Sequence, residues 1–392
     1  MNESSINHRC VIIGADAAGL ETAYEIKKLG LIPAVIDLSE EVEMNALSLK
    51  YGLRPYFKEP EMSERINEIS GNIQQIKIST GGNRWTIPVT RNDIIGCREH
   101  RLRSVFREVV TTVNIPVKDD LDDIILTRKN GKYHLTTLKN GKNEEYSPEL
   151  IIVTRRNFAV KNGLISQTAN SFFISIESDF ENVYGRPGNL EYFYSQDSLF
   201  PAGYILIEQI SSRRAHLTLR FASDSKASGE IDGTNYIDWI SENIGITASR
   251  LGTASQISDT IVGKKYIYNE NTCFTGETFI LVGDAAGISE PLFGNSYPYI
   301  LYSGKIAAHI AQSAFESGDL SSDFLLKYDT MLRSTISPVM NSFQAVRDQI
   351  FSSSEKLNEF IEDINRSRNP ANERFMESMI KYIYRKGFFG NR

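Results

Sequence analysis

The stretch GADAAG, residues 14–19, follows the apolar run VII and leads into LETAYEIKKLG. A buried strand, a glycine-rich turn and a helix form the arrangement that binds the pyrophosphate of a dinucleotide, because free backbone N–H groups and the helix dipole favour phosphate. Gly14 permits a tight turn, and Gly19 lets the helix approach the sheet. Asp16 replaces the middle glycine of this fingerprint and adds bulk and negative charge where the pyrophosphate would approach.

An acid follows at the distance that such a site requires. PAVIDL reads as the second strand and ends near Asp37, ~20 residues beyond the first glycine, where a carboxylate would accept the ribose hydroxyls. We therefore predict that Gly14, Ala15, Asp16, Gly19 and Asp37 form a dinucleotide site. The alternative is a plain strand–helix–strand crossover that binds nothing.

A second motif lies late in the chain. FILVGDAAG reads as a buried strand that ends in a tight turn at Gly283 and Asp284. PLFGNSYP then opens a helix rich in small residues, expected over 296–313.

The segment between the two motifs is mostly strand. Two KNGK sequences predict Asn-Gly hairpin turns, and ELIIV reads as another buried strand. From about residue 160 to 265 the alternation of apolar and polar residues predicts an antiparallel sheet. Tyr192, Tyr194 and Tyr204 are candidates to line an apolar substrate pocket on it; the alternative is that they are ordinary core.

The composition limits the classes of function. The chain has 392 residues, 41% hydrophobic and 23% charged, and a net charge of −6, so no basic surface argues for nucleic acid. Cys10, Cys97 and Cys273 lie far apart and the five histidines are scattered, so no metal site is expected. The polar start and the absence of a long apolar run predict a cytoplasmic protein.

With these two motifs, the chain resembles the geranylgeranyl reductase family, within the larger group of flavoproteins that share the p-hydroxybenzoate hydroxylase fold. That family has an N-terminal GxGxxG, an acid that ends the second strand, and a late GD motif followed by a proline and a glycine-rich helix start. The corresponding residues here are 14–19, Asp37, GDAAG, Pro291 and Gly294. FPAGYILIEQ also resembles the substrate strand of the family through Pro201 and Tyr204.

The resemblance implies FAD as cofactor and assigns further residues to it. Asp284, after Gly283, would accept hydrogen bonds from the ribityl chain, and Asp37 would hold the adenosine ribose. The helix that begins after Pro291, Gly294, Asn295 and Ser296 would point at the pyrimidine edge of the flavin. Arg98 lies where the family places an arginine near the cofactor.

Several positions depart from the family pattern. Asp16 replaces a glycine, Asn295 and Ser296 replace two more, and 154–156 is Thr-Arg-Arg where relatives carry an alanine-aspartate-glycine turn. No cysteine occurs between 38 and 60, where reductases of the family present one beside the flavin. Either Asp16 is turned away from FAD, with Arg155 or Arg156 as counter-charge, or phosphate is no longer bound.

These features predict an α/β fold with a Rossmann-like FAD-binding domain, an inserted antiparallel β-sheet substrate domain and C-terminal helices. The expected boundaries are 1–160 with 262–318, then 161–261, then 319–392. The expected function is FAD-dependent reduction of isoprenoid double bonds in a lipid-like substrate, with peripheral membrane contact through the basic amphipathic segment 373–389. The alternatives are a monooxygenase of the same fold and a non-enzymatic relative that has lost flavin.

Overall fold

The computed structural model describes residues 8–38, 49–52, 64–65, 71–80, 83–88, 95–165, 172–195, 203–222, 240, 250–292, 294, 296–350 and a few positions between 353 and 362. The predicted membrane segment 373–389, and Asn295, lie outside these residues. No helix in the described ranges is both long enough and apolar enough to cross a bilayer.

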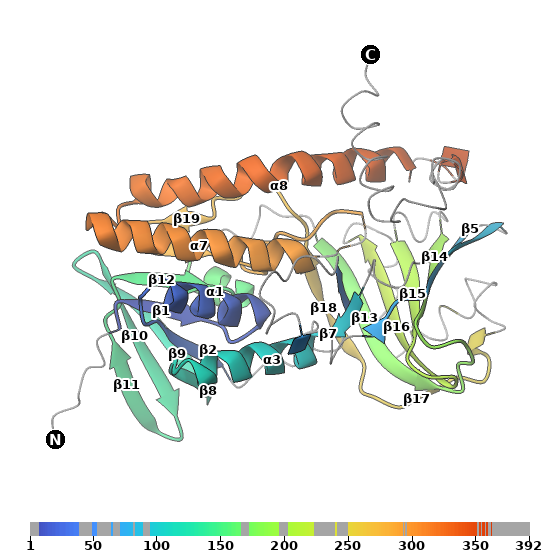
Figure 1. The fold of residues 1–392 in the computed structure, drawn as a ribbon, viewed down its shortest axis with the longest axis horizontal. Helices are drawn as coiled ribbons and strands as arrows, with labels where there is room; N and C mark the ends of the chain where they lie inside the picture. The colour runs from blue at the N-terminus through green and yellow to red at the C-terminus, as the bar shows by residue number, and fades with distance from the viewer. Residues whose placement is uncertain are drawn as a thin grey trace, which may run out of the picture.

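A six-stranded sheet carries the first motif (Figure 1). Its strands, in spatial order, are β19 (Thr275–Gly276), β20 (Phe279–Leu281), β12 (Leu150–Val153), β1 (Cys10–Ile13), β2 (Ala34–Leu38) and β8 (Val117–Leu121). All neighbouring pairs are parallel except β19 with β20. The central strands are fully buried on both faces, as expected for a parallel sheet covered by helices.

Three helices pack against one another beside this sheet (Figure 1). α1 (Ala17–Lys28) follows β1, α7 (Tyr297–Ser317) contacts α1, and α8 (Ser322–Ile350) contacts α7. Gly304 permits the close approach of α7 to α1, because a Cβ there would lie 2.5 Å from the Thr22 hydroxyl. α3 (Glu99–Thr112) also contacts α1, and the short α4 (Arg156–Lys161) follows β12.

An eight-stranded sheet forms the second part of the molecule (Figure 1). Its strands are β17 (Ser255–Gln256), β13 (Phe172–Glu181), β16 (Arg214–Ala222), β15 (Gly203–Gln209), β14 (Asn189–Ser195), β5 (Gln75–Thr80) and β6 (Asn83–Pro88), with β18 (Ile261–Tyr266) beside β13. The pairs are antiparallel except β14 with β5. β5 and β6 come from inside the predicted FAD-binding segment, whose boundaries stay a prediction.

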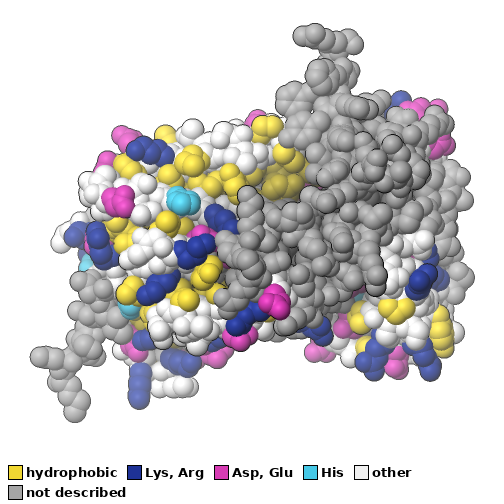
Figure 2. Space-filling view, in the orientation of Figure 1, with side chains coloured by type: hydrophobic (Ala, Val, Ile, Leu, Met, Phe, Trp, Pro, Cys, Tyr) yellow, Lys and Arg dark blue, Asp and Glu magenta, His cyan; other side chains and the backbone are white. Residues whose placement is uncertain are grey.

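Two small sheets complete the described part. β9 (Asp123–Lys129), β10 (Lys132–Lys139) and β11 (Lys142–Tyr146) form a meander, and β3 (Leu49–Gly52), β7 (Ile95–Arg98) and β4 (Gly71–Asn72) form the other sheet. The Asn-Gly hairpin turns are confirmed: Asn130, Gly131, Asn140 and Gly141 all have positive φ. On the face in Figure 2, hydrophobic side chains gather along α7 and α8 with charged side chains among them.

Candidate functional site

The two sequence motifs meet at the carboxyl ends of β1, β12 and β20. β1 and β20 both pair with β12, so the turns that follow the three strands are neighbours. A Cβ on Gly283 would lie 2.8 Å from the Ala18 side chain, which places the GD turn directly against the start of α1. The first and the second glycine motif therefore belong to one site.

Asp16 caps the first helix of this site. Its Oδ1 accepts a hydrogen bond from the Gly19 N–H at 2.8 Å, and its Oδ2 accepts one from the Thr154 hydroxyl at 2.7 Å. The N–H of the third helical residue is thereby satisfied by a side chain, as in an ordinary N-cap. Burial raises the pKa of the Asp16 carboxyl, and the positive charge of Arg155 acts against this.

Asp37 is bound by two arginines. Arg155 Nε donates to Asp37 Oδ1 at 2.8 Å and Arg155 Nη2 donates to Oδ2 at 2.6 Å, which is a two-point contact. Arg103, from α3, adds a hydrogen bond to Oδ2 at 3.0 Å. The Asp37 side chain is 0% exposed. Both oxygens that would accept ribose hydroxyls thus accept hydrogen bonds from the chain itself.

The GD turn is held by α7 and by β18. The Gly283 N–H donates to the Ser303 hydroxyl at 3.2 Å, and Gly283 takes a φ of 62°, which glycine adopts without strain. Asp284 Oδ1 accepts a hydrogen bond from Lys265 Nζ at 3.1 Å. The Asp284 side chain is 37% exposed, whereas that of Lys265 is buried. Asp284 is therefore the open carboxylate of the site.

Arg156 joins the turn after β12 to the larger sheet. Its guanidinium carbon lies 3.9 Å from the centre of the Tyr266 ring, and its Nη1 donates to the Ala285 carbonyl at 3.1 Å. Burial lowers the pKa of Arg156. All three residues of the Thr-Arg-Arg turn thus contact groups in or beside the site.

The turn before α7 meets the larger sheet at Gly294. Gly294 has a φ of 67°, and a Cβ there would lie 2.8 Å from Arg220 Nη1 on β16. Ser296, at the start of α7, is 1% exposed and its hydroxyl has no hydrogen-bond partner within the described ranges. Pro291 is buried. Arg98 ends β7, but its side chain lies outside the described part of the chain.

The three predicted pocket tyrosines form one cluster. The ring centres of Tyr192 and Tyr194 lie 6.1 Å apart, and that of Tyr204 lies 5.5 and 5.8 Å from them. Arg220 Nη1 donates to the Tyr204 hydroxyl at 2.8 Å, which connects the cluster to the Gly294 turn. All three rings are buried, and burial raises the pKa values of Tyr194 and Tyr204.

Arg220 is also held by a buried ionic network in the larger sheet. Glu177 Oε1 accepts hydrogen bonds from the Ser175 hydroxyl at 2.8 Å and from Arg220 Nη2 at 3.4 Å. His216 lies between Glu177 and Asp179, at 3.4 and 2.8 Å. Burial by itself would raise the pKa of Glu177, but His216, Arg220 and Ser175 together bring it down to about 2.

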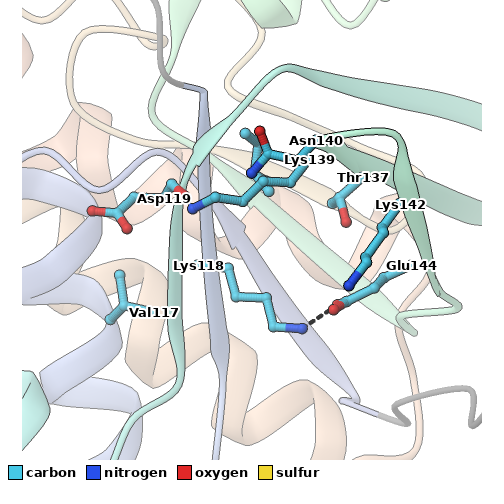
Figure 3. Close-up of a pocket in the computed structure, with 9 residues that line it drawn as sticks. Val117, Lys118, Asp119, Thr137, Lys139, Asn140, Lys142 and Glu144 are labelled. Atoms are coloured by element: carbon cyan, nitrogen blue, oxygen red, sulfur yellow. Dashed lines mark hydrogen bonds and ion pairs between the residues drawn. The ribbon is translucent and has the colours of Figure 1, made fainter.

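A separate hollow of about 370 Å³ lies at the far edge of the six-stranded sheet. Figure 3 shows its polar lining from β8, β10 and β11, with the Lys118 ammonium pointing at Glu144. None of the predicted site residues lines this hollow. In the described ranges, no cluster of His, Cys, Asp and Glu is arranged to hold a metal ion.

The sequence is similar to those of known reductases. No family model matches the chain. It is 27% identical to a digeranylgeranylglycerophospholipid reductase of Methanospirillum hungatei over 36% of the chain and 34% of that protein. It is 24% identical to the digeranylgeranylglycerophospholipid reductase of Methanocaldococcus jannaschii over 84% of the chain and 83% of that protein. The chain is a divergent relative of the geranylgeranyl reductases.

Solved structures agree with this relationship at the level of the fold. A geranylgeranyl bacteriochlorophyll reductase-like protein from Thermoplasma acidophilum superposes with a TM-score of 0.77 at 15% identity, over 97% of the chain and 96% of that protein. A halogenase crystallised with FAD gives a TM-score of 0.70 at 11% identity, over 100% of the chain and 84% of that protein. The predicted α/β fold, with a parallel sheet and a second antiparallel sheet, is confirmed.

The two ends of the predicted FAD site differ in how well they suit the cofactor in this reductase relative. At the flavin end, the open Asp284 carboxylate, the Gly294 turn and the buried Ser296 hydroxyl are suited to a polar ligand. At the adenosine end, Asp37 is fully covered and Asp16 caps the helix. The flavin end fits FAD and the adenosine end does not.

The sequence did not single out several residues that build this site. Arg103, Arg220, Lys265 and Tyr266 each contact a predicted residue or its support, but they lie on a helix and on strands with no motif around them. One signal was present: Asp16 follows β1, Asp37 lies near the end of β2 on one side of β1, and Arg155 follows β12 on its other side, so charges of opposite sign share one sheet edge.

Proposed function

We propose that this reductase relative is a flavin-dependent oxidoreductase that reduces carbon–carbon double bonds of an isoprenoid, lipid-like substrate. One observation carries the proposal: the tyrosine cluster of the larger sheet is linked through Arg220 to the Gly294 turn that opens α7. An apolar substrate on the tyrosines would then lie next to the flavin end of the site. A bound flavin supplies hydride transfer.

The residues of the chain have distinct roles in this proposal. The Ser296 hydroxyl would donate to the electron-rich edge of the ligand, where the dipole at the N-terminus of α7 favours negative charge. Asp284 accepts from its hydroxyl groups. The Tyr204 hydroxyl oxygen accepts a hydrogen bond from Arg220, and we propose this hydroxyl as the proton donor to the substrate. Its raised pKa keeps it protonated at neutral pH.

The substrate is proposed on the character of the tyrosine cluster. Three aromatic rings meet within 6.1 Å, and the nearby ionic groups Arg220 and Glu177 are paired with each other. Such a surface favours an apolar chain over a charged substrate. A cavity that is long and apolar, between the larger sheet and α7, stays a prediction.

The experiment starts with the absorption spectrum of the purified protein after incubation with flavins. The reduced complex is then mixed under anaerobic conditions with a geranylgeranyl lipid, and the product is analysed by mass spectrometry. We expect the mass to rise by one H₂ for each reduced double bond. Tyr204→Phe should lower the rate at least tenfold, whereas Tyr133→Phe, far away on the meander, should not. An unreduced lipid with fully bound flavin would refute the proposed reaction.

Two alternatives have observations in their favour. The likeness to a halogenase crystallised with FAD supports other flavin chemistry on the same fold. Oxygen consumption with transfer of oxygen to a substrate would identify a monooxygenase. The Arg155–Asp37 contact favours a relative that has lost flavin and serves as a binding protein. A protein that remains colourless with every flavin would identify that case.

A further inference from the structure

The departures at the adenosine end are not independent of one another. Thr154 and Arg155 lie directly on the glycine turn: a Cβ on Gly14 would meet the Thr154 hydroxyl oxygen at 2.0 Å and Arg155 Cγ at 3.1 Å. The Thr154 hydroxyl in turn donates to Asp16 at 2.7 Å. The space above Gly14, where a pyrophosphate would approach the backbone, is therefore filled by side chains of residues 154 and 155.

Polar groups at both ends of the ADP-binding half are also satisfied by the chain. The Gly19 N–H, one of the first-turn donors of α1, is taken by Asp16. The two Asp37 oxygens are taken by Arg155, at 2.8 and 2.6 Å, and by Arg103. The guanidinium provides the parallel pair of donors that two ribose hydroxyls would provide. The positive charge of Arg155 also acts on Asp16, where it opposes the larger effect of burial on the pKa of that carboxyl, so one side chain contributes to both acid sites.

We infer that Arg155, Thr154 and Asp16 together close the ADP-binding half of the site, and that the protein takes flavins without selecting for their ADP portion. Asp16 in the glycine motif and Arg155 after β12 together replace the nucleotide. The flavin half rests on the proposed function, through Asp284, Gly294 and Ser296. The closed half does not depend on the proposed function, because it rests on the hydrogen bonds of Asp16 and Asp37 and on the side chains that fill the space over Gly14.

The first test compares ligands on the wild-type protein by isothermal titration calorimetry. FAD and flavin mononucleotide should bind within about threefold of each other, and 5 mM ADP should not raise the melting temperature. Binding of FAD at least tenfold tighter than flavin mononucleotide, or protection by ADP, would overturn the inference. Failure of every flavin to bind would refute the proposed function and leave the ADP measurement to decide the inference.

The second test opens the site with the double variant Asp16→Gly, Arg155→Ala, whose fold is checked by circular dichroism. ADP should now raise the melting temperature, and affinity for FAD should increase at least tenfold relative to flavin mononucleotide. The control is Arg103→Ala, which leaves the Arg155–Asp37 contact in place and should not admit ADP. An opened, folded variant that still ignores ADP would overturn the closure. A misfolded double variant is replaced by Arg155→Gln, read in the same way.

Discussion

At the scale of single residues, the site is a set of compensated substitutions. Asp16 is tolerated in a glycine position because it gains a helix cap, the Thr154 hydroxyl and the field of Arg155. Arg155 is tolerated at a turn because its guanidinium forms two hydrogen bonds with the Asp37 carboxylate. Removal of one partner from such a buried set leaves a charge or a polar group without compensation, which is costly.

The charge of Asp16 should reduce stability at neutral pH. Because the folded-state pKa of this acid is raised, the folded protein loses stability as the pH rises through it. Asp16→Asn keeps the bond from Gly19, and the Thr154 hydroxyl then donates to the Ile13 carbonyl, now at 3.3 Å. We expect the free energy of unfolding at pH 7 to rise by about 1 kcal/mol, with the gain disappearing below about pH 4.

Urea denaturation over this pH range measures the effect. The matched variant Asp16→Ala loses the cap and should lower the free energy of unfolding by about 1 kcal/mol. A destabilised Asp16→Asn protein at pH 7 would show that the carboxylate charge itself is needed.

Glu177 should have the opposite dependence on pH. Its pKa of about 2 lies below the value of about 4.3 for an unfolded glutamate, so its contribution is complete above pH 4.3 and is lost as the pH falls through 2. The contribution is of the order of 3 kcal/mol. Glu177→Gln should therefore flatten the acid limb of the stability curve. Glu181→Gln, on the same strand, is the control, and an unchanged acid limb in Glu177→Gln contradicts the network.

At the scale of elements, turns that contain glycines with positive φ determine how closely strands and helices approach one another. Gly14 follows β1, Gly283 lies shortly after β20, and Gly294 lies in the turn before α7. All three turns also leave room for a neighbouring side chain, in addition to relieving backbone strain. Gly294 leaves room for the Arg220 guanidinium, which is held by Tyr204, Ser175 and Glu177 and has little freedom to move aside.

Gly294→Ala and Gly318→Ala separate the two effects. Both glycines have similar backbone angles, with φ of 67° and 70°, but nothing lies within 4 Å of a Cβ on Gly318. Gly318→Ala should cost about 1 kcal/mol of unfolding free energy from backbone strain. Gly294→Ala should cost about 1 kcal/mol more, because the Arg220–Tyr204 hydrogen bond is displaced. Equal losses in chemical denaturation would mean that Arg220 moves freely.

At the scale of the whole molecule, β18 couples the two main sheets. It pairs with β13 in the larger sheet, while Lys265 contacts Asp284 and Tyr266 receives Arg156 from the turn after β12. Contacts of this kind fix the position of the tyrosine cluster relative to the GD turn. The geometry of the proposed reaction depends on them more than on either sheet alone.

Arg156→Ala should weaken this coupling. The guanidinium is buried over the Tyr266 ring, where a cation–π contact is worth about 2 kcal/mol. We expect a loss of about 2 kcal/mol in the free energy of unfolding and faster hydrogen exchange in β18. Arg213→Ala, which removes an exposed arginine from over Tyr184 at 5.6 Å, should cost less than about 1 kcal/mol. Similar losses in the two variants would argue against a role for Arg156 in joining the sheets.

The sequence by itself determined the fold class and the position of the two glycine motifs. Apolar runs such as CVII and LIIV bury themselves as parallel strands, and glycine turns at their ends follow from local backbone sterics, so α1, β2 and α7 were predictable. The strand positions of Tyr192, Tyr194 and Tyr204 were also predictable, because alternation along a strand shows which residues share a face, whereas their role in a substrate pocket stays a prediction.

Only the tertiary structure decided where the charged side chains of the site point. Asp16, Asp37 and Arg155 lie on three different segments, and the sequence left open whether Asp16 faces a phosphate or turns away. The parallel pairing of β1 with β2 and with β12 brings the three together, and the low solvent exposure makes their mutual pairing decisive. Hydrogen bonds between distant segments have no sequence period, so the closure at the adenosine end became visible only in the folded chain.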